Sequence, residues 1–271
     1  MKFHSTNKKS DSASLREAVF HGLAPDGGLF MPERIPRLPK KFIDRLSGLS
    51  FHEIALEVAY ALIGADVPKK VLKKMVAKAI NFDAPLVPLN GNTFVLELFH
   101  GPTLAFKDFG ARFMAELVSY FSRNSKKEVV ILTATSGDTG SAVAQGFFGV
   151  PNVKVVVLYP KGRVTKVQES QMATLGRNIQ AIEVRGTFDD CQALVKRAFL
   201  DEDLNNRLNL TSANSINIAR LIPQTFYYFW AVAQIQKFMV HSSRFIVRSS
   251  LSTKRKSESA NHELRTMNRL V

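Results

Sequence analysis

The sequence predicts an α/β fold, in which a parallel sheet is covered by helices and follows a mainly helical N-terminal domain. Two observations support this prediction. From residue 107 onward, short apolar segments rich in β-branched residues alternate with segments of helical periodicity. Upstream, apolar residues recur at steps of three and four, the spacing of amphipathic helices. Strands that alternate with helices favour a parallel sheet buried on both faces.

The N-terminal domain is expected to cover residues 1–85. Its segment 23–33 contains a Pro-Asp-Gly-Gly cluster, which predicts a loop. Helical periodicity predicts helices over 51–63 and 68–80. A loop with two prolines, Pro85 and Pro88, then leads into a short predicted strand, 93–99.

The second predicted domain covers residues 86–240 and holds the alternating elements. These are helices at 107–123, 140–148, 165–175, 187–200 and 215–239, and strands at 128–135, 153–158 and 179–184. The last stretch, 241–271, is a basic, serine-rich tail with seven lysine and arginine residues against two glutamates. Such a segment buries too little apolar surface to offset its conformational entropy, so we expect it to be disordered.

The composition, 45% hydrophobic and 22% charged, is that of a globular protein. The single cysteine, Cys191, excludes an intrachain disulfide and suits a reducing compartment, so we expect a cytoplasmic protein and a buried, inert Cys191. No apolar run is long enough for a membrane helix, and no membrane partner is expected. The net charge of +14 is spread along the chain without a zinc-finger or RNA-binding signature. A small anionic ligand is therefore favoured over nucleic acid, and no metal is expected.

Lys107 stands in an apolar, aromatic segment that runs from Glu97 to Gly110. Apolar surroundings favour the neutral, nucleophilic form of a lysine amine, which a Schiff base with an aldehyde cofactor requires. The alternative is an ordinary lysine at a helix start, with its amine in solvent.

A polar turn follows the first strand of the predicted sheet. Glycines allow a ligand to approach its backbone, and the N–H groups at the start of the next helix can bind an anion. The carboxyl end of a parallel strand is also where open α/β sheets place their ligands. The alternative is a capped helix start without a ligand. The candidate binding residues of this turn are Ser136, Gly137, Asp138, Thr139 and Gly140.

A third polar cluster precedes the predicted helix 215–239. Three of its residues, Asn217, Arg220 and Gln224, are spaced by three and four, so they share one helical face. An arginine flanked by amides suits a carboxylate or a phosphate. Two alternatives are open: Asn214 and Ser215 only cap the helix, or the shared face is merely solvated.

Together these segments closely resemble the threonine synthase family, which belongs to the fold-type-II pyridoxal-phosphate enzymes. The resemblance covers roughly residues 1–240. It rests on the segments 3–10, 22–32, 100–110, 135–140 and 214–224. It implies a fold-type-II sheet, pyridoxal 5'-phosphate as cofactor, and Lys107 as the residue that carries it.

The family converts O-phospho-L-homoserine and water to L-threonine and phosphate, so the resemblance implies this substrate and reaction. It implies that Lys107 also moves protons, and that residues 136–140 hold the cofactor or the substrate carboxylate. Substrate binding is expected from Asn214, Ser215, Asn217, Arg220 and Gln224, with Arg220 and Asn217 at the substrate phosphate.

The chain departs from the family near its end. Family members continue with a strand and a glycine-rich loop that binds the cofactor phosphate, whereas residues 241–271 contain no glycine. We therefore expect a fold that is incomplete at the C-terminus, from a truncated or frameshifted reading frame, with weak cofactor binding and little turnover. The alternatives are a related pyridoxal-phosphate dehydratase, or a catalytically dead remnant whose basic tail binds an acidic partner.

Overall fold

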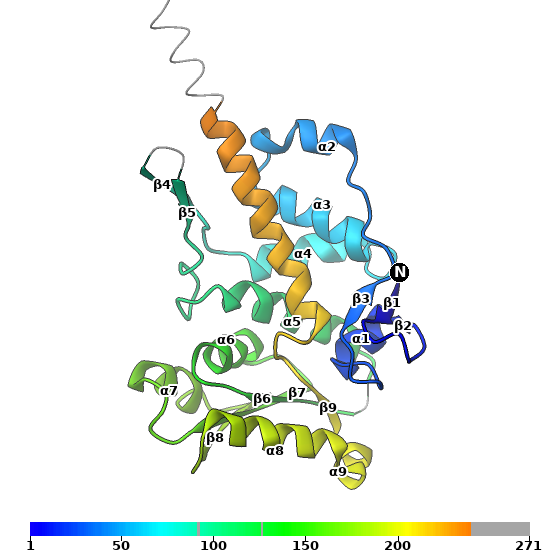
Figure 1. Cartoon of the computed structure of the whole chain (residues 1–271), viewed down its shortest axis with the longest axis vertical. Helices are drawn as coiled ribbons and strands as arrows, with labels where there is room; N and C mark the ends of the chain where they lie inside the picture. Colours follow the sequence, from blue (N-terminus) through cyan, green and yellow to red (C-terminus); the bar gives the residue numbers. More distant parts are fainter. Residues whose placement is uncertain (91–92, 126, 240–271) are drawn as a thin grey trace, which may run out of the picture.

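The computed structural model describes residues 1–90, 93–125 and 127–239 (Figure 1). The predicted tail, 241–271, lies outside these residues. The main sheet has four parallel strands in the order β8-β7-β6-β9, which confirms the predicted parallel α/β architecture. Its strands are β6 (Val129–Ala134), β7 (Val153–Pro160), β8 (Ile179–Val184) and β9 (Asn209–Thr211).

Helices cover both faces of this sheet (Figure 1). On one face, α8 (Phe188–Leu200) packs against β6 and β7 through Cys191, which is buried as predicted. On the other face lie α6 (Asp138–Phe147) and, behind it, α5 (Lys107–Ser122). Every residue of β6 is buried, which explains its unbroken apolar sequence.

The N-terminal region contains the two predicted helices, α3 (Phe51–Ile63) and α4 (Lys69–Ala79). Ser50 and Glu53 form a capping box that sets the start of α3. The region also contains a three-stranded antiparallel sheet that the sequence analysis missed, because its strands are too short to show a period of two. The further elements are β1 (Lys2–Ser5), β2 (Ala13–Ser14), α1 (Leu15–His21), β3 (Phe30–Pro32), α2 (Lys40–Asp44) and the 3₁₀ helix η1 (Leu46–Gly48).

A β-hairpin lies between the N-terminal helices and α5. It pairs β4 (Leu86–Asn90) with β5 (Thr93–Leu96), of which only the second was predicted. Proline in and beside β4 favoured a loop, but a two-stranded hairpin tolerates proline at its edge. Two short helices are α7 (Lys166–Ala173), which was predicted, and α9 (Glu202–Arg207), which was not.

A long helix, 218–239, crosses the molecule and packs on the N-terminal helices (Figure 1). Its Trp230 stacks on Phe51 at 5.4 Å and donates a hydrogen bond to the Ala84 carbonyl at 2.9 Å. One core of buried side chains runs from Phe3 to Ala233. The division into domains at 1–85 and 86–240 stays a prediction. Within the described residues, none of the helices has the length and apolar character to cross a bilayer.

Candidate functional site

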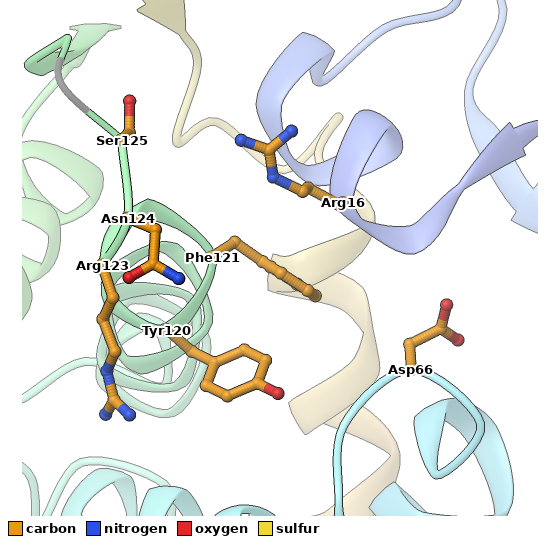
Figure 2. A pocket seen from close by; sticks show the side chains of 7 residues that line it. All are labelled: Arg16, Asp66, Tyr120, Phe121, Arg123, Asn124 and Ser125. Carbon is orange, nitrogen blue, oxygen red and sulfur yellow. The ribbon is translucent and has the colours of Figure 1, made fainter.

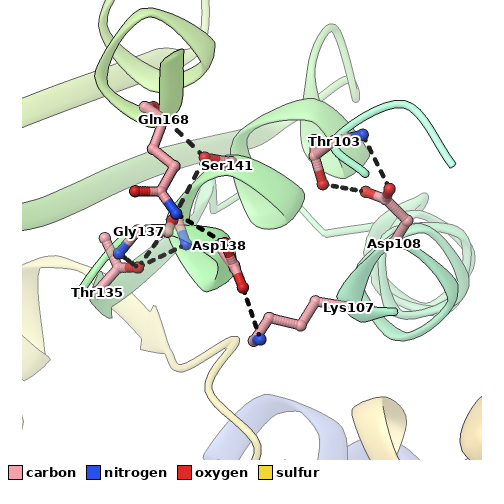
Figure 3. A network of polar contacts seen from close by, with 9 residues as sticks. Thr103, Lys107, Asp108, Thr135, Gly137, Asp138, Ser141 and Gln168 are labelled. Atoms are coloured by element: carbon pink, nitrogen blue, oxygen red, sulfur yellow. Dashed lines mark hydrogen bonds and ion pairs between the residues drawn. The ribbon is translucent and has the colours of Figure 1, made fainter. Parts of the chain in front are cut away.

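Lys107 is the first residue of α5, and the preceding loop fixes its position. Asp108, the next residue, accepts hydrogen bonds from the backbone and the hydroxyl of Thr103 in that loop. The Lys107 amine lies 4.5 Å from the centre of the Phe106 ring and 3.2 Å from Oδ2 of Asp138 (Figure 3). The predicted aromatic setting is therefore only part of its environment, because a carboxylate also contacts the amine.

The turn between β6 and α6 is organised by Thr135. Its Oγ1 accepts hydrogen bonds from the N–H groups of Gly137 and Gly140, both at 2.9 Å, and donates one to the Gly137 carbonyl. Gly137 has φ +141°, a backbone conformation that other residues rarely adopt. Helix α6 begins at Asp138, two residues before the predicted start. Ser136 is exposed and Thr139 is half-buried.

The first turn of α6 provides a place for an anion. Gly137 precedes the helix and gives it no side-chain cap. The N–H groups of Asp138 and Thr139 have no hydrogen-bond partner in the described part of the chain. Free N–H groups at a helix N-terminus attract negative charge.

Gln168 is a polar residue of this site that the sequence analysis did not identify. It lies in α7, and its Nε2 donates a hydrogen bond to Oδ1 of Asp138 at 2.7 Å (Figure 3). The sequence does contain one relevant signal. Thr165 and Gln168 have the spacing of a capping box, and they form one at the start of α7.

The loop after β9 reaches the same edge of the sheet. Because β9 lies beside β6 and runs parallel to it, the residues that follow both strands meet at the carboxyl edge. Asn214 lies in this loop, and its Oδ1 is buried without a hydrogen-bond partner in the described structure. Ser215 is exposed. The structure thus brings the start of this cluster to the edge that carries the 135–140 turn.

Asn217 is fully buried, and its side-chain amide forms hydrogen bonds with backbone groups. Its Nδ2 donates to the carbonyls of Val19 and Ser212, and its Oδ1 accepts from the Ala219 N–H. The Val19 carbonyl also accepts from the hydroxyl of Thr211. Asn217, rather than Asn214 or Ser215, therefore caps the helix that begins at 218.

Arg220 is also buried, with 1% of its surface exposed, so this face of the helix is not solvated. Its Nη1 donates to the Ala213 carbonyl at 2.6 Å, while Nε has no partner among the described residues. Burial lowers the pKa of Arg220 to about 10. Gln224 donates to the Arg220 carbonyl at 3.3 Å. Roles for Asn217, Arg220 and Gln224 in substrate binding stay predictions.

A separate groove of about 490 Å³ lies at the other end of α5 (Figure 2). The groove is lined on one side by Arg16 of α1 and by Asp66. On the other side it is lined by Tyr120, Phe121, Arg123, Asn124 and Ser125. Asp66 is already paired with the amino group of Met1 at 2.9 Å. Since Lys107 begins α5 and Tyr120 lies in its last turn, roughly 20 Å of helix separates this groove from the Lys107 site.

Comparison with known proteins assigns the class of this fold and site. The chain belongs to the family described as "Pyridoxal-phosphate dependent enzyme", whose profile matches residues 80–243. A second profile, "Threonine synthase N terminus", matches residues 2–80. Within the family, the similarity is to threonine synthases. That of Escherichia coli is 48% identical over 87% of this chain, and that of Serratia marcescens is 47% identical over the same share.

Solved structures agree with this assignment. The crystal structure of Escherichia coli threonine synthase superposes with a TM-score of 0.80 over 86% of this chain. A pyridoxal-phosphate-bound threonine synthase from Brucella melitensis superposes with a TM-score of 0.81 at 40% identity, over 87% of this chain. The matches cover 54% and 52% of those two chains. This chain thus spans about half the length of the relatives that it matches.

Proposed function

We propose that this chain carries the Lys107 side of a threonine synthase site, which converts O-phospho-L-homoserine and water to L-threonine and phosphate. The observation that carries the proposal is the position of the Lys107 amine, 3.2 Å from Asp138 in the turn at the carboxyl edge of the sheet. Family membership and the similarity to threonine synthases support the same reaction. The cytoplasmic location expected from the single cysteine stays a prediction.

The described residues fit pyridoxal phosphate in part. Lys107 offers an amine for its aldehyde, and the unpartnered Oδ1 of Asn214 offers an acceptor for its ring hydroxyl. The free N–H groups at the start of α6 suit a carboxylate or a phosphate. Residues 187–271 contain no glycine, so this stretch holds no counterpart of a glycine-rich phosphate loop. We propose that Lys107, Asn214 and the 136–140 turn hold the cofactor and the substrate carboxylate.

The chemistry divides between the cofactor and the protein. Bound pyridoxal phosphate would accept the electrons that are released when the substrate loses a proton. Lys107 is the group that can take up and return protons. Its amine is held at the site by Asp138, and 21% of its side-chain surface is exposed. Asp138 orients that amine and balances its positive charge. The α6 N–H groups, with the hydroxyls of Ser136 and Thr139, would orient the substrate.

A cofactor-capture experiment tests this proposal. The purified chain is incubated with pyridoxal phosphate and treated with borohydride, which reduces the bond between the lysine nitrogen and the cofactor aldehyde. Peptide mass spectrometry then locates the modified lysine. We expect capture at Lys107, and its loss in Lys107→Ala. Lys161→Ala is the matched control, because Lys161 is also paired with a carboxylate, that of Glu183 at 2.8 Å.

The same samples, given phosphohomoserine, are assayed for threonine. Two results together would contradict the assignment of Lys107. The parent chain would show no cofactor on Lys107, and Lys107→Ala would capture as much cofactor on other lysines as the parent does. Threonine formation by the parent chain that Lys107→Ala abolishes would extend the proposal from cofactor binding to the whole reaction.

A further inference from the structure

The oxygen and the nitrogen of the Gln168 side-chain amide form hydrogen bonds with different residues. Its Oε1 accepts hydrogen bonds from the N–H and the hydroxyl of Thr165, at 3.0 and 3.1 Å. Because an amide oxygen cannot donate, this end must face Thr165, and the Nε2 end must face Asp138. The capping box of α7 therefore sets the direction in which Gln168 offers its donor.

Asp138 continues the contact to Lys107. Its Oδ1 accepts from Gln168 at 2.7 Å, and its Oδ2 contacts the Lys107 amine at 3.2 Å (Figure 3). One chain of polar contacts thus joins α7, α6 and α5. The Asp138 side chain is 50% exposed, and its contacts with Gln168 and Lys107 hold it in one of the orientations that it could otherwise leave for water.

The turn itself is shaped around Gln168. A Cβ on Gly137 would lie 2.5 Å from the Gln168 side-chain amide, so the absence of a side chain at Gly137 leaves the room that this amide occupies. The hydroxyl of Ser141 in α6 also donates to the Gln168 backbone carbonyl at 3.4 Å. Side chain and backbone of Gln168 therefore both contact the segment that carries Asp138.

We propose that Gln168 is a positioning residue, which acts on Lys107 by holding the Asp138 carboxylate against its amine. The inference rests on the proposed function, in which Lys107 binds the cofactor. Removing the donor of Gln168 leaves Asp138 with one fixed partner instead of two, so the position of the Lys107 amine becomes less defined. Cofactor capture depends on that position.

Three variants separate this role from a structural role in α7. Gln168→Met removes the acceptor that Gln168 adds to the capping box and the donor to Asp138, while its backbone N–H still donates to the Thr165 hydroxyl. Thr165→Ala removes the hydroxyl of the cap but keeps the backbone N–H of residue 165, which still fixes the direction of the Gln168 amide. Gln168→Glu keeps an acceptor for the cap, since glutamate is a usual capping-box residue, but has no donor for Asp138. If Gln168 positions Lys107, both Gln168 variants change the behaviour of Lys107 and Thr165→Ala does not.

The first readout is cofactor capture at Lys107 as a function of pyridoxal phosphate concentration. We expect the half-saturating concentration to rise about fivefold or more in Gln168→Met and Gln168→Glu, and to stay within about twofold in Thr165→Ala. Thermal unfolding by circular dichroism checks that each variant is folded. A change in Thr165→Ala and Gln168→Met without one in Gln168→Glu would overturn the proposal, because the α7 cap would then explain it.

The second readout does not need the cofactor. Acetic anhydride labels neutral amines, and mass spectrometry compares Lys107 with Lys161 in the same sample. We expect labelling of Lys107 to rise about threefold in Gln168→Met, where Asp138 no longer holds the amine, and to change in Gln168→Glu as well, because that variant also lacks the donor to Asp138. In an Asp138→Asn background, Gln168→Met should add no further change.

The two readouts distinguish the proposals. If the parent chain captures no cofactor at Lys107 while labelling changes as described, the proposed function fails and the positioning role stands. If Gln168→Met alters labelling equally with and without Asp138, Gln168 does not act through Asp138 and the inference is wrong.

Discussion

Asp108 ties Thr103 to the first turn of α5 through both of its carboxylate oxygens. Oδ2 accepts from the Thr103 N–H at 2.9 Å, and Oδ1 accepts from its hydroxyl at 2.7 Å. The contact is buried, and a Cβ on Gly101 would lie 2.5 Å from Oδ2. A buried carboxylate thus holds the loop that leads into Lys107.

Replacing Asp108 with alanine should destabilise the fold by about 2–3 kcal/mol, because two donors of Thr103 lose their partner inside the protein. Asp108→Asn should cost less, since its amide oxygen can accept from the N–H while the Thr103 hydroxyl turns to accept from the amide nitrogen. Urea unfolding of the three proteins checks this order. If both variants lose the same free energy of unfolding, the amide of asparagine does not replace the carboxylate as a partner of Thr103, and this prediction is wrong.

Burial raises the pKa of Asp108, and this has a consequence for stability in mild acid. Between the unfolded pKa, which is the ordinary one, and the raised folded pKa, the folded state binds more protons than the unfolded state. The contribution of Asp108 to stability is therefore largest below the ordinary pKa and is lost as the pH rises through the folded pKa. Asp108→Asn lacks this dependence. Subtracting its stability curve from that of the parent chain should reveal the loss, and a flat difference would contradict it.

Gly137→Ala should destabilise the fold by about 2–4 kcal/mol and weaken cofactor capture at Lys107. The new Cβ would sit on the Gln168 amide, in a backbone conformation that alanine rarely adopts. Gly149→Ala is the matched control, because Gly149 also has a positive φ but has open space where the Cβ would lie. Similar losses of capture in the two variants would show that the contact with Gln168 does not matter.

Gly110→Ala should displace Arg220, because the added Cβ would lie 2.6 Å from its Nε. Overpacking of this kind costs about 1–3 kcal/mol. Gly48→Ala, whose Cβ would meet no atom within 4 Å, serves as the control in thermal unfolding. If Arg220 binds the substrate phosphate, Gly110→Ala should also weaken phosphohomoserine binding, which calorimetry measures.

Asp26 should stabilise the fold at neutral pH and not in strong acid. It accepts hydrogen bonds from the Ser5 hydroxyl at 2.6 Å and from the N–H groups of Gly28 and Lys9, and these bonds lower its pKa. A lowered pKa contributes stability above the ordinary pKa, and this is lost as the pH falls through the folded pKa. Asp26→Asn should therefore destabilise the chain at neutral pH and approach the parent in acid. Asp44→Asn is the exposed control.

The parts of the fold that could be predicted are those with a local signal. The helix at 51–63 has its own periodicity and a capping box that starts at the preceding residue, Ser50, and the strand at 179–184 was located to the residue. The strands β1 and β3 carry no such signal. They are three or four residues long and depend on pairing across a loop that Asp26 organises, which only the tertiary structure reveals.

For the candidate site, the sequence located the turn at 135–140 because glycines and hydroxyls follow an apolar strand. It could not show which way the helix after residue 217 faces. Spacing places Asn217 and Arg220 on one side, but only packing shows that this side is buried. Gln168 was missed for a similar reason, since its partner lies 30 residues earlier in the chain.

The Val19 carbonyl gives the molecule a particular order of assembly. Val19 lies in α1 of the N-terminal region, yet the residues that donate to its carbonyl, Thr211 and Asn217, lie 192 and 198 residues later. Most of the chain must therefore leave the ribosome before the carbonyl of Val19 in the first helix can accept these two hydrogen bonds. Closing so long a loop is slow. We expect the nascent N-terminal region to stay locally open during synthesis, where pulse proteolysis of arrested chains would detect it.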